Sequence, residues 1–83
     1  MYKISIKRRA RKALTQLPDE DYQRVQRAIR GLATAPRPVG SKKLKEREAW
    51  RLRVGVYRVI YEIEDEQLLI LVIDVRHRRE AYR

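Results

Sequence analysis

Apolar and polar residues alternate at the start of the chain. Tyr2, Ile4 and Ile6 are separated by a lysine and a serine, and this period of two is typical of a β-strand with one buried face. Over residues 8–17 the apolar residues recur at helical spacing and leave a basic outer side. The pattern predicts a strand followed by a helix, which Pro18 ends.

A second helix is predicted after this proline. Three carboxylates stand at its first positions, where the helix dipole favours negative charge. Apolar residues then follow at spacings of three and four as far as Ala35. Because the connection between the two helices is short, we expect them to form a hairpin. The acidic residues are Asp19, Glu20 and Asp21, and the main apolar positions are Tyr22, Val25, Ile29 and Leu32.

The middle of the chain has a weaker pattern until alternation returns. Residues 36–41 contain two prolines and a glycine and are predicted to be a loop. Residues 42–48 are polar and predict no element. Trp50, Leu52 and Val54 are then separated by arginines. This register predicts that the three apolar side chains face the helices and that the arginines face away.

Two further strands are predicted in the last third of the chain. Gly55 marks a turn or bulge, and residues 56–63 follow as a strand. A polar hairpin loop over residues 64–66 leads to residues 67–75, which are almost entirely apolar. Such a run is typical of a strand covered on both faces. The polar tail, residues 76–83, predicts no element.

The element order is therefore β-α-α-β-β-β in a single domain spanning residues 1–83, a length that leaves no room for a second core. We expect an α+β fold in which a helical hairpin packs on a mainly antiparallel four-stranded sheet. The chain has no cysteine, so disulfides and thiolate ligands are excluded. No apolar run approaches the roughly 20 residues of a membrane-spanning helix, and we expect no membrane partner.

Charge adds a candidate partner. Twenty-one Lys and Arg against eleven Asp and Glu give a net charge of +10. The charge is blocked, with six positive and no negative residues in 1–17, eight against two in 37–58, and five negative and no positive residues in 59–74. One interpretation is a basic soluble surface. Blocked charge favours the other, a nucleic acid, because phosphate contacts release condensed counterions.

The residue types limit the chemistry. With one histidine, and with carboxylates mainly at a helix start and a hairpin tip, the sequence predicts no metal site and no cofactor. RNA carries its own nucleophile, so a protein can cleave it by aligning the 2′-OH, neutralising the phosphate and moving two protons. Arginine binds phosphate oxygens but stays charged. The proton carrier would therefore be His77, a lysine or a tyrosine.

Two groups of residues offer this chemistry. Arg51 and Arg53 share one face of a predicted strand, and Arg58 follows on the next strand. The alternative is a solvated outer face of an amphipathic strand. The second group lies in the tail, which could equally be a frayed end. Its members are Arg76, His77, Arg78, Arg79 and Tyr82.

The same residues carry a resemblance to the RelE/ParE toxin family. Residues 50–62, WRLRVGVYRVIYE, resemble the family's basic strand followed by a Gly-x-Tyr-Arg-φ-φ-Tyr hairpin, where φ is apolar. Residues 75–82, VRHRREAY, resemble its closing motif, and the element order agrees. The RelE branch cleaves mRNA in the ribosomal A site without metal and is held inactive by a cognate antitoxin. The resemblance thus implies a cytoplasmic, ribosome-dependent endoribonuclease that inhibits translation, with ribosome, mRNA and antitoxin as partners and a monomeric toxin in the toxin–antitoxin complex.

The resemblance also implies residue roles. Arginines in the basic pair contact the mRNA backbone, two others stabilise the transition-state phosphate, and the tyrosine takes part in proton transfer or base stacking. The expected RNA-binding residues are Arg51, Arg53, His77 and Arg79, and the expected catalytic residues are Arg58, Arg78 and Tyr82.

The chain departs from the family pattern in two places. Arg51 and Arg53 stand where one known pattern has lysines, and Arg76 stands where a glycine is common. The ParE branch shares the fold but inhibits DNA gyrase without nuclease activity, and this is the alternative function. A plain RNA-binding module is a third reading. Retention of Arg58, Arg78 and Tyr82 favours the RelE branch.

Overall fold

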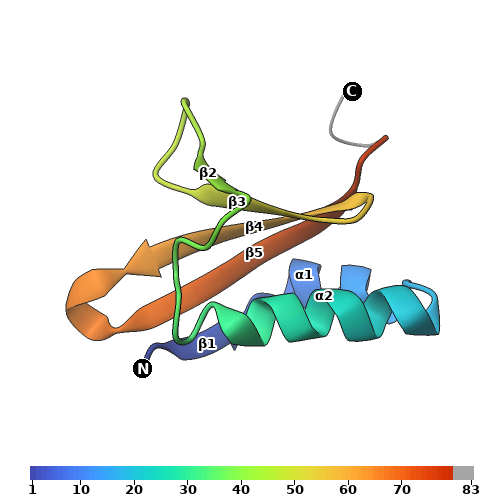
Figure 1. Cartoon of the computed structure of the whole chain (residues 1–83), viewed down its shortest axis with the longest axis horizontal. Coiled ribbons are helices and arrows are strands. Elements are labelled where there is room, and N and C mark those ends of the chain that lie inside the picture. Colours follow the sequence, from blue (N-terminus) through green and yellow to red (C-terminus); the bar gives the residue numbers. More distant parts are fainter. Residues whose placement is uncertain (80–83) are drawn as a thin grey trace.

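The structure, a computed structural model, describes residues 1–79. Two helices lie on one side of a five-stranded sheet (Figure 1). A single 3-10 turn, Asp65–Gln67, connects the last two strands. In chain order the elements are β1 (Lys3–Ile6), α1 (Arg8–Thr15), α2 (Asp19–Gly31), β2 (Ser41–Lys43), β3 (Trp50–Val54), β4 (Tyr57–Glu64) and β5 (Leu69–His77).

The sheet has the order β1-β5-β4-β3-β2. The first strand pairs with β5 in parallel, and the other neighbours are antiparallel. The α+β class and the mainly antiparallel sheet are thus confirmed, but the expectation of four strands is wrong. The extra strand, β2, is a short edge strand in which Ser41 lies opposite Leu52. Its polar residues give no hydrophobic alternation, so only pairing with β3 reveals it.

The core lies between the helices and one face of the sheet. Leu52 and Val54 are buried and Arg53 is exposed, which confirms the predicted register of β3. Trp50 is half-buried, with the guanidinium carbon of Arg37 5.3 Å from the centre of its ring. The fully buried side chains are contributed by both layers and include Val25, Ile29, Leu32, Val59, Tyr61, Ile70 and Val72.

Strand β5 differs from its prediction in two ways. Ile70 is fully buried but Leu71 is only half-buried, so the expectation of burial on both faces is wrong. The strand also continues to His77, because that residue still pairs with Tyr57. A bulge interrupts the ladder, since Ile60 pairs with Asp74 while Tyr61 pairs with Val72.

Both helices are shorter than predicted. The first ends at Thr15 rather than residue 17, where the Thr15 hydroxyl donates a 2.6 Å hydrogen bond to the carbonyl of Lys12. The second ends at Gly31 rather than Ala35, and the chain continues in tighter turns. Neither helix in the described chain is long and apolar enough to cross a bilayer.

Candidate functional site

The turn between β3 and β4 fixes the geometry of the site. Only Gly55 and Val56 separate the paired residues Val54 and Tyr57. Gly55 has a φ of +61°, whereas Val56 does not have a positive φ. A two-residue hairpin with its left-handed residue first is a type II′ turn, which needs glycine there. The turn matches the twist of the strands and sets their register.

This register places arginines in a row across three adjacent strands. Arg53 of β3 lies opposite Arg58 of β4, and Arg58 lies opposite Arg76 of β5. Arg51, two residues before Arg53, extends the basic face towards Lys42 on β2. Like charges placed directly opposite each other are destabilising. The register therefore concentrates positive charge on the open face of the sheet.

One member of this row has a carboxylate beside it. The Nε of Arg76 donates a 2.8 Å hydrogen bond to Oδ2 of Asp74. Asp74 is buried, and its Oδ2 also lies 3.6 Å from Nε of Arg9 on α1. Asp74 thus joins α1 to β5 and partly neutralises Arg76.

The segment after β5 adds a further arginine to the row. The backbone N–H of Arg78 donates a 2.6 Å hydrogen bond to the carbonyl of Val56 at the hairpin turn. Arg53, Arg58 and Arg78 then line one hollow of about 160 Å³, together with Gly55, Val56 and Tyr57. Three of the expected site residues, from three segments, thus come together. Among residues 1–79, no carboxylate lines this hollow.

Two other expected residues lie in a different depression. His77 and Arg79 line a groove of about 720 Å³ beside α1, not the arginine-lined hollow. The Nδ1 atom of His77 accepts a 3.1 Å hydrogen bond from the backbone N–H of Arg79. The imidazole also meets the ring of Tyr57 edge-on, with 5.5 Å between the ring centres. Tyr82 lies outside the described residues.

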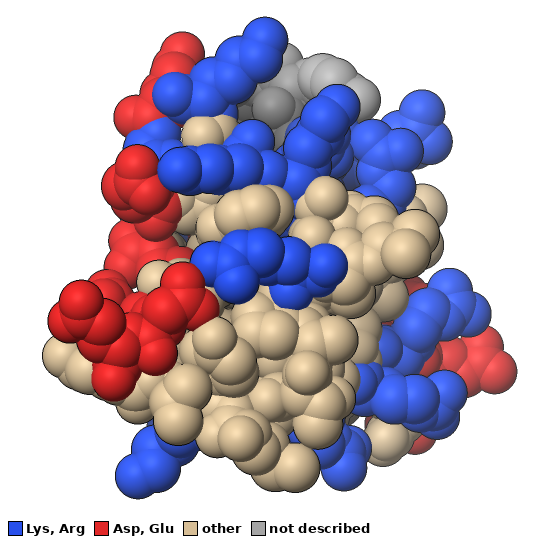
Figure 2. Space-filling model, turned by 60° about the vertical axis from the view of Figure 1, so that its left-hand side comes forward, with Lys and Arg blue, Asp and Glu red and all other residues tan. Residues whose placement is uncertain are grey.

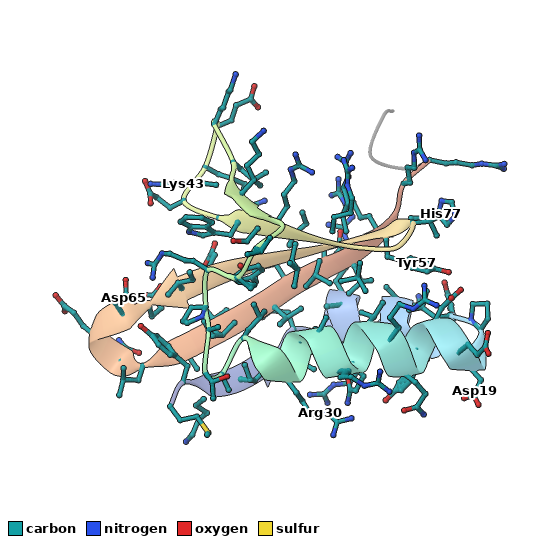
Figure 3. All side chains as sticks on the ribbon, viewed as in Figure 1. Asp19, Arg30, Lys43, Tyr57, Asp65 and His77 are labelled. Carbon is teal, nitrogen blue, oxygen red and sulfur yellow. The ribbon has the colours of Figure 1, made fainter. Side chains whose placement is uncertain are left out.

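Tyr57 connects the site to the helical layer. Its hydroxyl donates a 2.9 Å hydrogen bond to Oδ2 of Asp21 in the first turn of α2 (Figure 3 labels Tyr57). Burial, with a further contribution from this hydrogen bond, raises the pKa of Tyr57. The phenol therefore stays protonated near neutral pH and positions α2 against β4.

Sequence reasoning missed the place of Arg76 in the row. Its spacing from Arg78 gave no signal, because the bulge in β5 hides which residue faces Arg58.

Across residues 1–79, no three His, Asp or Glu side chains are grouped so as to hold a metal ion. The arginines that line the hollow supply planar donors for phosphate-like oxygens and charge that persists at all physiological pH values. Figure 2 shows Lys and Arg gathered over the upper part of the molecule.

Comparisons with known proteins show which family the chain is similar to. Residues 4–82 match the family model described as the ParE toxin of type II toxin–antitoxin systems. Toxin RelG of Mycobacterium tuberculosis is 31% identical over 84 residues, which is 99% of this chain and 97% of that protein. A chain of the RelBE2 toxin–antitoxin complex from the same organism superposes with a TM-score of 0.83 and 28% identity, over 93% of this chain and 98% of the other.

A second solved structure extends the likeness to archaea. The RelE–RelB complex of Pyrococcus horikoshii contains a chain with a TM-score of 0.83 and 29% identity, over 93% of this chain and 94% of that one. The family match covers almost the whole chain and includes the β3–β4 hairpin and β5. The chain therefore belongs to the RelE/ParE family of toxins of type II toxin–antitoxin systems.

Proposed function

We propose that this toxin is a ribosome-dependent, metal-independent endoribonuclease that cleaves translated mRNA in the cytoplasm and so inhibits translation. The observation that carries the proposal is the hollow lined by Arg53, Arg58 and Arg78. An anion seated there lies beside three arginines and the glycine-containing turn. Donors arranged in advance for a developing negative charge are an effective source of catalysis.

The roles follow from the chemistry of each group. Arg58 and Arg78 hold the scissile phosphate and neutralise the charge that builds on it. Arg51 and Arg53 guide the adjoining backbone along the open face of the sheet. Because arginines do not exchange protons near neutral pH, Tyr82 is proposed to move the proton, with His77 as the competing carrier. Arg79 and His77 bind RNA beside the groove.

We further propose that a cognate antitoxin covers this basic surface or displaces the tail. Two similar chains described above come from toxin–antitoxin complexes, which supports an antitoxin partner. The toxin is proposed to be monomeric within such a complex. The groove beside α1 is lined by the basic residues Arg9, Lys12, Arg76 and Arg79. A segment with acidic residues would complement it.

The test is a reconstituted translation reaction with one defined mRNA, in which cleavage ends are mapped with and without ribosomes. The full chain is made by cell-free synthesis, because a toxin is hard to express. We expect cuts only on ribosome-bound mRNA, and single-turnover rates about 10²–10³-fold lower for Arg58→Ala and Arg78→Ala. Arg30→Ala, which removes the same charge from α2 away from the sheet (Figure 3), should cleave normally.

The ParE-like alternative is measured in parallel as inhibition of DNA supercoiling by gyrase. Intact ribosome-bound mRNA together with blocked supercoiling would replace the nuclease proposal with gyrase inhibition. If the chain binds mRNA but changes neither reaction, it is an RNA-binding module.

A further inference from the structure

Arg24 of the helical layer lies against Gly55, one of the residues that line the arginine-lined hollow. A β-carbon at position 55 would lie 3.2 Å from Nη1 of Arg24, so the guanidinium of Arg24 extends over the hairpin turn. Arg24 belongs to α2, which lies on one side of the sheet (Figure 1), whereas Arg53 alternates with the buried Leu52 and Val54 and faces the other side. Gly55 lies between them and lines the hollow. The absence of a side chain at Gly55 therefore leaves room for a cation at the tip of the hairpin.

The position of Arg24 is fixed by the contact one turn earlier. Asp21 and Arg24 are three residues apart and so share one face of α2. Because Oδ2 of Asp21 accepts the 2.9 Å hydrogen bond from Tyr57, this face of the helix is held against the start of β4. Helix α2 therefore holds the guanidinium of Arg24 close to the β3–β4 turn.

The charge of Arg24 is also available. Arg37, Arg47 and Arg76 each lie within 4 Å of a carboxylate oxygen. Arg24 is exposed and has no such ion pair among the residues that the structure describes. An exposed guanidinium with no carboxylate oxygen within 4 Å among the described residues, close to a hollow lined by three other arginines, extends the positively charged surface around the hairpin.

We propose that Arg24 binds the phosphate next to the one held in the hollow, so that the RNA backbone passes over the hairpin tip from the sheet side to the helix side. This inference rests on the proposed RNA substrate. A phosphodiester chain fits the site better than a protein segment, because the tip offers guanidinium groups and bare backbone, and Val56 is its one exposed apolar side chain in the hollow's lining. Arg24 acts here as a binding residue and takes no part in proton transfer.

The test measures binding of a short single-stranded RNA that is 2′-O-methylated throughout and so cannot be cleaved. The logarithm of its affinity is plotted against the logarithm of salt concentration, and each phosphate contact contributes about 0.7 to the slope. Arg24→Ala should lower the slope by about 0.7 and weaken binding at low salt. Arg24→Lys keeps the charge and should keep the slope. Arg30→Ala, on the same helix but away from the sheet (Figure 3), should change the slope by much less.

An unchanged slope in Arg24→Ala would overturn the inference, as would equal losses in Arg24→Ala and Arg30→Ala, which would indicate only the loss of net charge. If Arg24→Ala leaves RNA binding intact but weakens binding of a glutamate-rich peptide, Arg24 belongs to a protein interface instead. The outcome is independent of catalysis. If the protein cleaves no mRNA, the proposed nuclease activity is wrong. If Arg24→Ala still lowers the salt slope in that case, the proposed contact between Arg24 and a phosphate stands.

Discussion

Arg53 and Arg58 lie directly opposite each other across β3 and β4, so two guanidinium groups share one position on the open face of the sheet. Opposed like charges destabilise a sheet, and an opposite-charge pair in the same place contributes roughly 0.2–1 kcal/mol. The pairing therefore links the anion-binding surface to the stability of the fold.

Replacing one of these arginines should separate the two properties. Arg53→Glu is expected to raise the free energy of unfolding by up to about 1 kcal/mol, because repulsion becomes attraction. The same variant should bind the uncleavable RNA more weakly, and its affinity should depend less steeply on salt. Urea unfolding and RNA titration measure the two effects. A variant that is destabilised, with unchanged RNA affinity, would contradict the electrostatic account of the row.

The hydrogen bond between Tyr57 and Asp21 should contribute to global stability. Tyr57→Phe removes the hydroxyl but keeps the ring against His77, and a hydrogen bond to a charged group is worth about 1.5 kcal/mol. For a domain of this size the loss corresponds to a fall in Tm of roughly 6–12 °C. Tyr22→Phe is the matched control, since Tyr22 is half-buried and follows Asp21 directly on α2. Equal Tm values for the two variants would show that the Tyr57 bond contributes nothing.

Proton transfer is tested by substitutions at the two candidate carriers. If the hydroxyl of Tyr82 moves the proton, Tyr82→Phe should slow single-turnover cleavage by about 10²–10⁴-fold while ribosome binding changes little. His77→Ala should then retain most of its activity. The reverse result would assign the proton to the imidazole. Normal cleavage by both variants would leave proton transfer to water or the ribosome.

The pH dependence of stability should contain a contribution from Asp65. Its Oδ1 accepts a 2.6 Å hydrogen bond from the Tyr2 hydroxyl and its Oδ2 a 2.9 Å bond from Arg37. The Tyr2 bond, and then the Arg37 bond, lower the pKa of Asp65. A carboxylate with a lowered pKa stabilises the folded state above its ordinary pKa, and the contribution is lost as pH falls through the lowered value.

Asp65→Asn should therefore lose less stability than the wild type between about pH 5 and pH 2. Urea midpoints across this range measure the difference. Glu66→Gln removes the same charge from the next residue and serves as the control for net charge. If the two variants follow the same acid profile, the contacts of Asp65 do not contribute to it.

Much of the fold could be predicted from the sequence because burial leaves a periodic trace. The alternation through Leu52 and Val54 fixed which face of β3 is buried. The edge strand β2 could not be predicted this way, because its residues Ser41–Lys43 are recruited by backbone pairing and bury no apolar stripe. The sequence also could not show that only one face of β5 is fully buried, because half-buried and fully buried apolar residues give the same pattern.

The site residues could be predicted only where they belong to a recognisable sequence motif. Arg53, Arg58 and Arg78 were found from their places in two sequence motifs, and the structure brings them together. Arg76 joins the row through a register that a bulge has shifted, and Arg24 reaches Gly55 from an element distant in sequence. Neither relationship leaves a local pattern, because each depends on how separate elements pack.

The parallel pairing of β1 with β5 has a consequence for the order in which the molecule can form during its synthesis. Lys3–Ile6 has its sheet partner in Leu69–Val72, some of the last residues of the domain to be made. A growing chain therefore holds its first strand and both helices without the surface that they pack on, and contacts between distant segments form slowly. Arg78, which completes the hollow, comes later still. The hollow lined by arginines therefore comes into existence only when nearly the whole domain has been translated.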